Sequence, residues 1–93
     1  MIHTYLVCFD ITDDKNRRFI SRRLEHEGLR VQYSVFEVPF ATPSDLTHLK
    51  NELREWMEPE DDIRFYHLCS ACRKKSLSVD DERIASFPLA VVL

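Results

Sequence analysis

Asp10 is the residue whose type and position most directly suggest chemistry. It ends an apolar, strand-like run from Ile2 to Ile11 and shares one side of that strand with Leu6 and Cys8. A carboxylate buried there is costly unless it meets a cation, a metal ion or hydrogen-bond donors. One interpretation is structural: Asp10 accepts backbone N–H groups at the entrance of the following helix, or pairs with Arg17. The other is a metal ligand. Because a single carboxylate holds Mg²⁺ poorly, the second interpretation needs a two-fold axis that brings two copies of Asp10 together.

Four arginines on the next segment form the second candidate. They are Arg17, Arg18, Arg22 and Arg23. Exposed charges on a helix usually do nothing specific, so a solvated face is one interpretation. Phosphate contact is the other, because the forked donors of a guanidinium group match a phosphate. Arg17 stands apart, since its azimuth falls close to the buried stripe of the helix and near Asp10. Arg30 adds a cation at the start of the next strand.

Cys69 and Cys72, with His67 just before them, have the spacing of half a zinc site. A complete structural zinc site needs four ligands, and the remaining cysteine and histidines are scattered. Unpaired thiols are therefore expected, with structural zinc or a redox pair as the alternatives. Three cysteines, an odd number, suit a cytosolic protein better than a disulfide framework.

A first helix and the strands around it have to position these side chains. Thr12-Asp13-Asp14 supplies cap residues for a helix that runs to about Glu27, and Gly28 is its expected C-cap. The β-rich segment 30–40 is either one long strand with a bulge or a tight pair of strands. The sequence leaves this choice open.

The second helix has the clearest pattern. Thr42-Pro43-Ser44-Asp45 is a strong helix start. The apolar residues that follow recur at helical spacing and are Leu46, Leu49, Leu53, Trp56 and Met57. A strand is expected over 63–68, and a last apolar segment, 87–93, could pair as an edge strand.

This order of elements predicts one α+β domain over residues 1–93, a ferredoxin-like sandwich of the βαββαβ type plus a C-terminal strand. Such a fold has helices on one face of a mainly antiparallel sheet and water on the other. The first two strand segments, however, are apolar on both sides. Phe19 is a large apolar residue that lies off the buried stripe of its helix, and the sequence shows no packing partner for it inside one chain. We therefore predict a homodimer whose sheets pack face to face.

Composition excludes several other classes of protein. Apolar residues make up 44% of the 93 residues and charged ones 31%, a balance that argues against disorder. No apolar run approaches the roughly 18 to 20 residues that span a bilayer, and no signal-peptide pattern is present. A cytoplasmic protein without a membrane role is expected. Because the net charge is −3, binding of nucleic acid has to rest on local clusters of charge.

The chain resembles the CRISPR-associated Cas-two family, the small partner of the integrase in spacer acquisition. The resemblance is carried by the strand end Tyr5-Leu6-Val7-Cys8-Phe9-Asp10-Ile11, then Asp13-Asp14 and Arg17-Arg18, then Gly28-Leu29-Arg30-Val31-Gln32-Tyr33-Ser34-Val35-Phe36-Glu37. It extends over nearly the whole chain. One departure is Phe9, where the family commonly has an aromatic residue with a hydroxyl group.

The resemblance implies a homodimer in which the C-terminal strand, residues 83–93, packs at the dimer. It also implies that Mg²⁺ (or Mn²⁺) binds between two copies of Asp10, with Arg17 as a catalytic partner. Arg17, Arg18, Arg22 and Arg30 are then the candidate nucleic-acid contacts, and Phe36 is the candidate contact with a partner subunit.

Two hypotheses of different classes follow from the resemblance. The first is a metal-dependent endonuclease that acts on single-stranded RNA or double-stranded DNA through Asp10. The second is a non-catalytic adaptor that holds protospacer DNA and binds the CRISPR integrase. The enzyme requires Asp10 as a metal ligand, whereas the adaptor tolerates its loss. The sequence does not choose between RNA and DNA.

Overall fold

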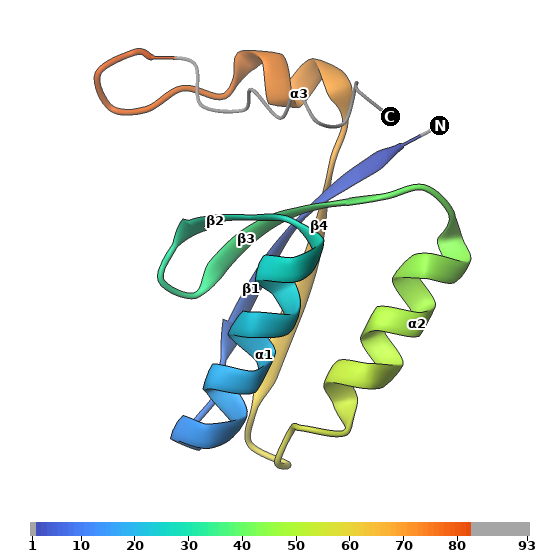
Figure 1. Cartoon of the computed structure of the whole chain (residues 1–93). Helices are drawn as coiled ribbons and strands as arrows, with labels where there is room; N and C mark the ends of the chain where they lie inside the picture. Colours follow the sequence, from blue (N-terminus) through green and yellow to red (C-terminus); the bar gives the residue numbers. More distant parts are fainter. Residues whose placement is uncertain (1, 83–93) are drawn as a thin grey trace.

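The computed structural model describes residues 2–82 as an α+β domain with one four-stranded antiparallel sheet. The elements follow in the order β1 (His3–Asp10), α1 (Asp14–Glu27), β2 (Leu29–Gln32), β3 (Val35–Phe40), α2 (Pro43–Arg54), β4 (Asp62–Leu68) and α3 (Ser70–Lys75). The strand order in the sheet is β2-β3-β1-β4 (Figure 1). This is the predicted ferredoxin-like βαββαβ topology. The segment 83–93, predicted to form a C-terminal strand at the dimer, lies outside the described residues.

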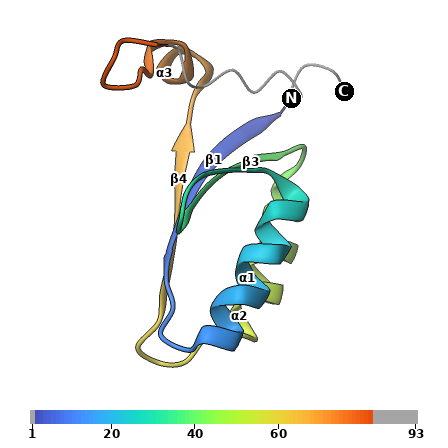
Figure 2. The same cartoon turned by 60° about the vertical axis from the view of Figure 1, so that its left-hand side comes forward.

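Helices α1 and α2 lie together on one face of the sheet (Figure 2). Both begin where the sequence predicts. The carboxylate of Asp13 accepts a hydrogen bond from the Asn16 N–H at 2.8 Å, and the hydroxyl of Thr42 accepts one from the Asp45 N–H at 3.1 Å. Each cap satisfies an N–H group that the first helical turn leaves unpaired. No helix within residues 2–82 is long and apolar enough to cross a membrane.

The segment 30–40 contains both features that the sequence left as alternatives. It forms two strands, β2 and β3, which make an antiparallel hairpin, and the register shifts between Arg30 and Gln32 as in a β-bulge. The turn of this hairpin contains Tyr33, which is 70% exposed, and Ser34. The hairpin therefore presents an exposed aromatic side chain at its turn.

The core lies between the sheet and the two helices. Its buried residues are Val7, Phe9, Ile11, Ile20, Leu24, Phe36, Val38, Phe40, Leu49 and Leu53. The odd-numbered apolar residues of β1 thus face the helices, and the even-numbered ones lie on the opposite face of the sheet. On that opposite face the chain leaves large apolar residues exposed, including Leu29 at 49% and Tyr66 at 48%.

Phe19 has a partner inside the chain, contrary to the expectation from the sequence. Its ring stacks on the ring of Trp56, with centroids 3.7 Å apart. Trp56 does not belong to α2, which ends at Arg54, one turn earlier than the apolar spacing predicts. The turn after α2 folds back toward α1, and Trp56 and Met57 therefore pack on the core from a loop.

The short helix α3 occupies the stretch that the sequence shows only as polar. The guanidinium group of Arg73 lies 4.0 Å from the carboxylate of Glu37, which is 6% exposed and sits on the sheet face away from α1 and α2. Burial raises the pKa of Glu37, and the charge of Arg73 opposes that rise. The Arg73 side chain of α3 therefore reaches the sheet face that α1 and α2 leave uncovered.

Gly28 ends α1 for a different reason from the one expected. A C-cap glycine usually has a left-handed backbone, but Gly28 is extended, with φ −159° and ψ −154°. A β-carbon on Gly28 would lie 2.2 Å from the carbonyl oxygen of Glu37 and 2.9 Å from the Cα of Val38. The residue is therefore glycine because β3 passes too close for a side chain.

Candidate functional site

The candidate site lies where β1 ends, α1 begins and the β2–β3 hairpin turns. The Phe9 N–H donates to the carbonyl oxygen of Ser34 at 3.1 Å, which holds the hairpin turn beside the end of β1. Phe9 is buried and its ring stacks on Phe36, with centroids 6.1 Å apart. The position where the family commonly has a hydroxyl-bearing aromatic residue is thus part of the core in this chain.

Asp10 is exposed, so the expectation of a buried carboxylate is wrong. It is the last residue of β1, where the sheet no longer covers it. Within the described part of the chain its side chain makes no hydrogen bond and no ion pair, with either backbone N–H groups or Arg17. Neither contact of the structural interpretation, with backbone N–H groups or with Arg17, is therefore present among the described residues, and the carboxylate is available to a ligand.

Asp62 lies directly opposite Asp10 in the antiparallel pairing of β1 with β4. Side chains in such a pair have β-carbons roughly 4.5–5.5 Å apart, and like charges placed so are unfavourable unless a cation lies near. Arg64 supplies such a cation, because its Nε donates to Asp62 Oδ2 at 2.7 Å. The pKa of Arg64 is raised, first by its hydrogen bond to the Tyr66 hydroxyl and then by Asp62. Sequence reasoning missed Asp62 because only the strand register reveals it.

Asp61, the residue before Asp62, ties the two loops at this end of the sheet together. Its carboxylate accepts hydrogen bonds from the Thr12 N–H and hydroxyl, both at 3.0 Å, and from the Glu58 N–H at 2.8 Å. These donors lower the pKa of Asp61, the Glu58 N–H most of all. The acidic turn before β4 thus fixes the end of β1 relative to the start of β4.

Arg17 is held at the strand end, as its azimuth predicts. Its Nη1 donates to the carbonyl oxygen of Ile11 at 2.9 Å, and its Nη2 pairs with the carboxylate of Asp14. The hydrogen bond to Asp14 raises the pKa of Arg17 most, and the Tyr33 hydroxyl adds to the rise. The guanidinium group therefore sits next to the backbone that follows Asp10, but its ionic partner is Asp14.

A groove of about 370 Å³ runs between α1 and the β2–β3 hairpin. It is lined by Asp14, Arg17, Arg18, Ser21, Arg22, Glu25, Arg30 and Tyr33. Four guanidinium groups and two carboxylates give it an excess of positive charge. Arg18 and Arg22 are exposed and have no carboxylate partner among the described residues. The groove thus contains all four arginines that the sequence predicted as nucleic-acid contacts.

Arg23, the fourth arginine of the helical run, does not belong to this groove. Its Nε and Nη2 donate to the two oxygens of Glu52 on α2 at 3.1 and 2.9 Å, and its Nη1 pairs with Glu27. These carboxylates raise the pKa of Arg23. Arg23 therefore links α1 to α2 through an ion pair and has a structural role.

Phe36 is a core residue and not a contact with a partner subunit. It is 0% exposed, because β3 lies inside the sheet and turns this side chain toward the helices. Arg30 covers it: the guanidinium carbon lies 5.1 Å from the centroid of Phe36 and 5.5 Å from that of Tyr33. Phe36 therefore supports the floor of the groove through Arg30.

The half zinc site is not completed by any described residue. No group of three His, Cys, Asp or Glu side chains that could hold a metal ion occurs within residues 2–82. His67 pairs instead with His3, their ring nitrogens 3.2 Å apart, while the Cys69 sulfur caps α3 by accepting the Cys72 N–H at 3.3 Å. This hydrogen bond lowers the pKa of Cys69, and the neighbouring Cys69 raises that of Cys72.

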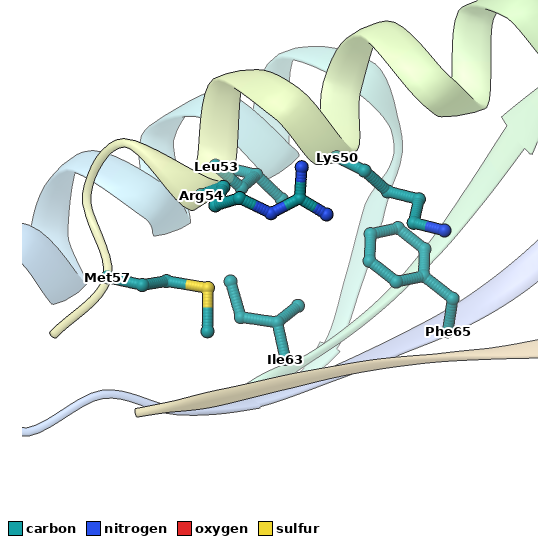
Figure 3. A pocket seen from close by; sticks show the side chains of 6 residues that line it. All are labelled: Lys50, Leu53, Arg54, Met57, Ile63 and Phe65. Atoms are coloured by element: carbon teal, nitrogen blue, oxygen red, sulfur yellow. The ribbon is translucent and has the colours of Figure 1, made fainter. Parts of the chain in front are cut away.

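A second cavity, of about 180 Å³, lies between α2 and β4 (Figure 3). Leu53, Ile63 and Phe65 line its apolar part, and Lys50 and Arg54 extend along it from α2. Because Ile63 pairs with Phe9, this cavity opens on the helix side of the sheet, away from the side chain of Asp10. Its lining offers no acid, nucleophile or metal ligand of the hard-oxygen type, so we do not place the site there.

Comparison with known proteins identifies a family. The model of the family described as CRISPR associated protein Cas2 matches residues 3–76. "CRISPR-associated endoribonuclease Cas2 2" of Synechocystis sp. is 42% identical over 74 residues, which are 77% of this chain and 78% of that protein. "CRISPR-associated endoribonuclease Cas2 4" of Rhodospirillum rubrum is 34% identical over an alignment of 94 positions, which covers 98% of this chain and 75% of that protein.

Solved structures agree with this result. A chain of a structure titled "Partial Cas6-RT-Cas1--Cas2 complex" superposes with a TM-score of 0.85 and 39% identity, covering 91% of this chain and 99% of that one. A crystal structure of Streptococcus pyogenes Cas2 gives a TM-score of 0.72 and 28% identity, covering 82% of this chain and 98% of that one.

Proposed function

This chain belongs to the CRISPR associated protein Cas2 family, and from that premise we propose that it is a divalent-cation-dependent endonuclease of CRISPR spacer acquisition. Its substrates are phosphodiesters of single-stranded RNA or double-stranded DNA. The names of the curated relatives, which are endoribonucleases, support the activity. The exposed carboxylate of Asp10 supports its location.

The observation that carries the proposal is the pair of facing carboxylates. Asp10 has no partner in the described part of the chain and lies opposite Asp62. Two hard oxygen donors at the end of two strands fit Mg²⁺, which binds through one or two carboxylates and keeps several waters. Asp10 is the primary ligand, because the oxygen Oδ2 of Asp62 already accepts from Arg64. Mn²⁺ suits the same donors.

The protein's own residues bind and orient the substrate. Arg18 and Arg22 have no carboxylate partners among the described residues and attract the phosphate backbone. Arg17, held by Ile11 and Asp14, presents a fixed guanidinium group near the scissile phosphate, where it stabilises charge that develops in the transition state. When bound, Mg²⁺ would polarise a phosphoryl oxygen and lower the pKa of a coordinated water.

The proposal includes a homodimer. Leu29 and Tyr66 on the sheet face away from α1 and α2 are about half exposed, although the strands are apolar there. A second copy that covers this face would bury them and would bring two copies of the Asp10–Asp62 pair toward one axis. A domain of this size gains stability from such an interface, since it buries a modest share of its own surface.

A second candidate function is the adaptor, and one comparison favours it. The structure with the TM-score of 0.85 comes from a complex whose title includes Cas1 and Cas2. As an adaptor, the dimer would bind the CRISPR integrase and hold protospacer DNA along its arginine groove. Asp10 would then be dispensable, whereas Arg18 and Arg22 would still be needed.

Cleavage assays separate the two functions. Labelled single-stranded RNA and duplex DNA are incubated with wild type, Asp10→Asn and Asp80→Asn, with Mg²⁺ or with EDTA. Asp80→Asn is the matched control, because it removes an equally exposed carboxylate from the turn after α3. If the protein is an endonuclease, wild type and Asp80→Asn should cleave with Mg²⁺ and not with EDTA. The cleavage rate of Asp10→Asn should be lower by at least about 100-fold, the range seen for removal of one electrostatic group.

Other outcomes contradict the proposal in different ways. Equal cleavage by wild type and Asp10→Asn would mean that Asp10 is not the metal ligand. Absence of cleavage by all three proteins, with duplex DNA still bound, would refute the enzyme and leave the adaptor as the function.

A further inference from the structure

Tyr33 is the aromatic residue among those that line the groove, and the proposed function gives it no role. It stands in the β2–β3 turn and is 70% exposed, the most exposed aromatic side chain of the described residues. Exposure of a large aromatic ring has a cost, because apolar area remains in water. Nothing in the packing of residues 2–82 requires it, since Phe36 and Phe9 belong to the buried core there without Tyr33.

The ring of Tyr33 is nevertheless held in place. The guanidinium carbon of Arg30 lies 5.5 Å from its centroid and also packs on Phe36, so Arg30 is sandwiched between the two rings. Arg30 is in turn paired with Glu25 of α1 at 3.7 Å. The Tyr33 hydroxyl also contributes to the raised pKa of Arg17, which lines the same groove.

These contacts leave one side of the ring available. Arg30 covers one face, and an exposure of 70% means that most of the remaining surface meets water. Tyr33 lines the same groove as Arg18 and Arg22. A flat aromatic surface beside unpaired guanidinium groups is the combination by which proteins bind a base and its phosphate together.

The groove is also too small to enclose a duplex, although a duplex can lie along it against the arginine side chains. Its volume of about 370 Å³ lies at the lower end of the range for ligand pockets, roughly 300–1,000 Å³, which suits one nucleotide. In a duplex each base is already stacked on its neighbours and presents only its edges, so no base face is available to Tyr33. An unpaired nucleotide offers both its base face and its phosphate.

We propose that Tyr33 is a stacking platform that receives one unpaired base of a single-stranded nucleic acid, while Arg18 and Arg22 bind the adjoining phosphates. The proposal rests on the nucleic-acid binding proposed above and assigns its specificity. Tyr33 makes single strands the preferred ligand of the groove, and Arg30 holds the ring rigid, so that little conformational entropy is lost on binding.

Binding of fluorescent oligonucleotides tests this assignment. Wild type, Tyr33→Phe, Tyr33→Ala and Arg18→Ala/Arg22→Ala are titrated in EDTA against a single-stranded RNA, its DNA counterpart and a blunt duplex of equal length. Stacking is worth about 1–3 kcal/mol per base, so Tyr33→Ala should weaken single-strand binding roughly 5- to 150-fold. Tyr33→Phe keeps the ring and should stay within about twofold of wild type. Duplex binding should be unchanged in both variants.

A second readout is specific for stacking. An oligonucleotide that carries 2-aminopurine loses fluorescence when this base stacks on an aromatic ring. Wild type and Tyr33→Phe should quench it, and Tyr33→Ala at saturating concentration should not. The dependence of affinity on salt should be the same for Tyr33→Ala and wild type, because no phosphate contact is removed.

The outcomes separate this proposal from the one it rests on. If Arg18→Ala/Arg22→Ala binds every oligonucleotide as wild type does, the groove does not bind nucleic acid and both proposals fail. If that variant loses affinity while Tyr33→Ala keeps its affinity for single strands and its quenching, only the stacking platform is refuted. A loss of duplex and single-strand binding to the same extent in Tyr33→Ala also refutes it.

Discussion

Substitution of Gly28 by alanine is the sharpest test of how the site is built. Gly28 joins α1, which carries Arg17, to β2, which carries Arg30. Its backbone is extended and suits any residue. The obstacle is the neighbouring strand, because the new β-carbon would lie 2.2 Å from the carbonyl oxygen of Glu37 and 2.9 Å from the Cα of Val38.

The size of the effect follows from these distances. Ordinary van der Waals contacts of a β-carbon begin near 3.4 Å, so β3 and the end of α1 have to separate by about 1 Å. Both obstructing atoms belong to the backbone of a paired strand and cannot rotate away. Overpacking typically costs about 1–3 kcal/mol, and backbone obstruction points to the upper end. For a domain of this size, about 3 kcal/mol lowers the melting temperature by roughly 12–24 °C.

Thermal unfolding followed by circular dichroism measures this effect. His26→Ala is the control, because His26 is exposed on the same helical turn and its replacement should change stability by no more than about 0.5 kcal/mol. A melting temperature of Gly28→Ala within about 2 °C of wild type would show that β3 does not pass this close to Gly28, and the account of the α1–β2 junction would be wrong.

Three further predictions concern residues outside the groove. Phe19→Ala should destabilise the protein by about 1–2 kcal/mol and shift the emission of Trp56, the single tryptophan, to longer wavelength, because its stacked ring is removed. Burial raises the pKa of Glu37, so the charged form of Glu37, which is present above that pKa, lowers the stability of the wild-type fold. Glu37→Gln carries no such charge, and its stability relative to wild type should therefore be higher at pH 7 than at pH 4. Cys69 should be alkylated faster than Cys8 at pH 7, since hydrogen bonds lower the pKa of Cys69 and burial raises that of Cys8.

Each of these has a clear contrary result. Unchanged tryptophan emission in Phe19→Ala would mean that the two rings do not stack. A difference in stability between Glu37→Gln and wild type that stays constant from pH 4 to pH 7, measured by urea unfolding, would show that the pKa of Glu37 is not raised. Equal rates for the two cysteines, followed by mass spectrometry of peptides, would exclude the cap at α3.

Local signals in the sequence were sufficient for the helices. Caps depend on residues within one turn, so Asp13 and Thr42 located the starts of α1 and α2 correctly. The ferredoxin-like topology followed from the order of elements, and Arg17 was placed at the strand end by helical geometry alone.

Non-local features could not be predicted in the same way. Asp62 faces Asp10 because of the β1–β4 register, which pairs residues 52 positions apart in the chain. Phe36 was assigned to a partner subunit by the family resemblance, and only the position of the helices shows that it faces the core. Phe19 found its partner in Trp56, which the sequence assigned to the second helix but which lies in the loop after the observed end of α2.

A metal-dependent endonuclease at this strand end requires that Asp10, with Asp62 opposite it, binds a divalent cation. Isothermal titration of Mg²⁺ and Mn²⁺ into the wild-type protein, Asp10→Asn and Asp80→Asn, without nucleic acid, measures this directly. We predict saturable binding by wild type and Asp80→Asn and its loss in Asp10→Asn. Binding of the same affinity and stoichiometry by Asp10→Asn would contradict the claim, and with it the assignment of a metal-dependent endonuclease to this strand end.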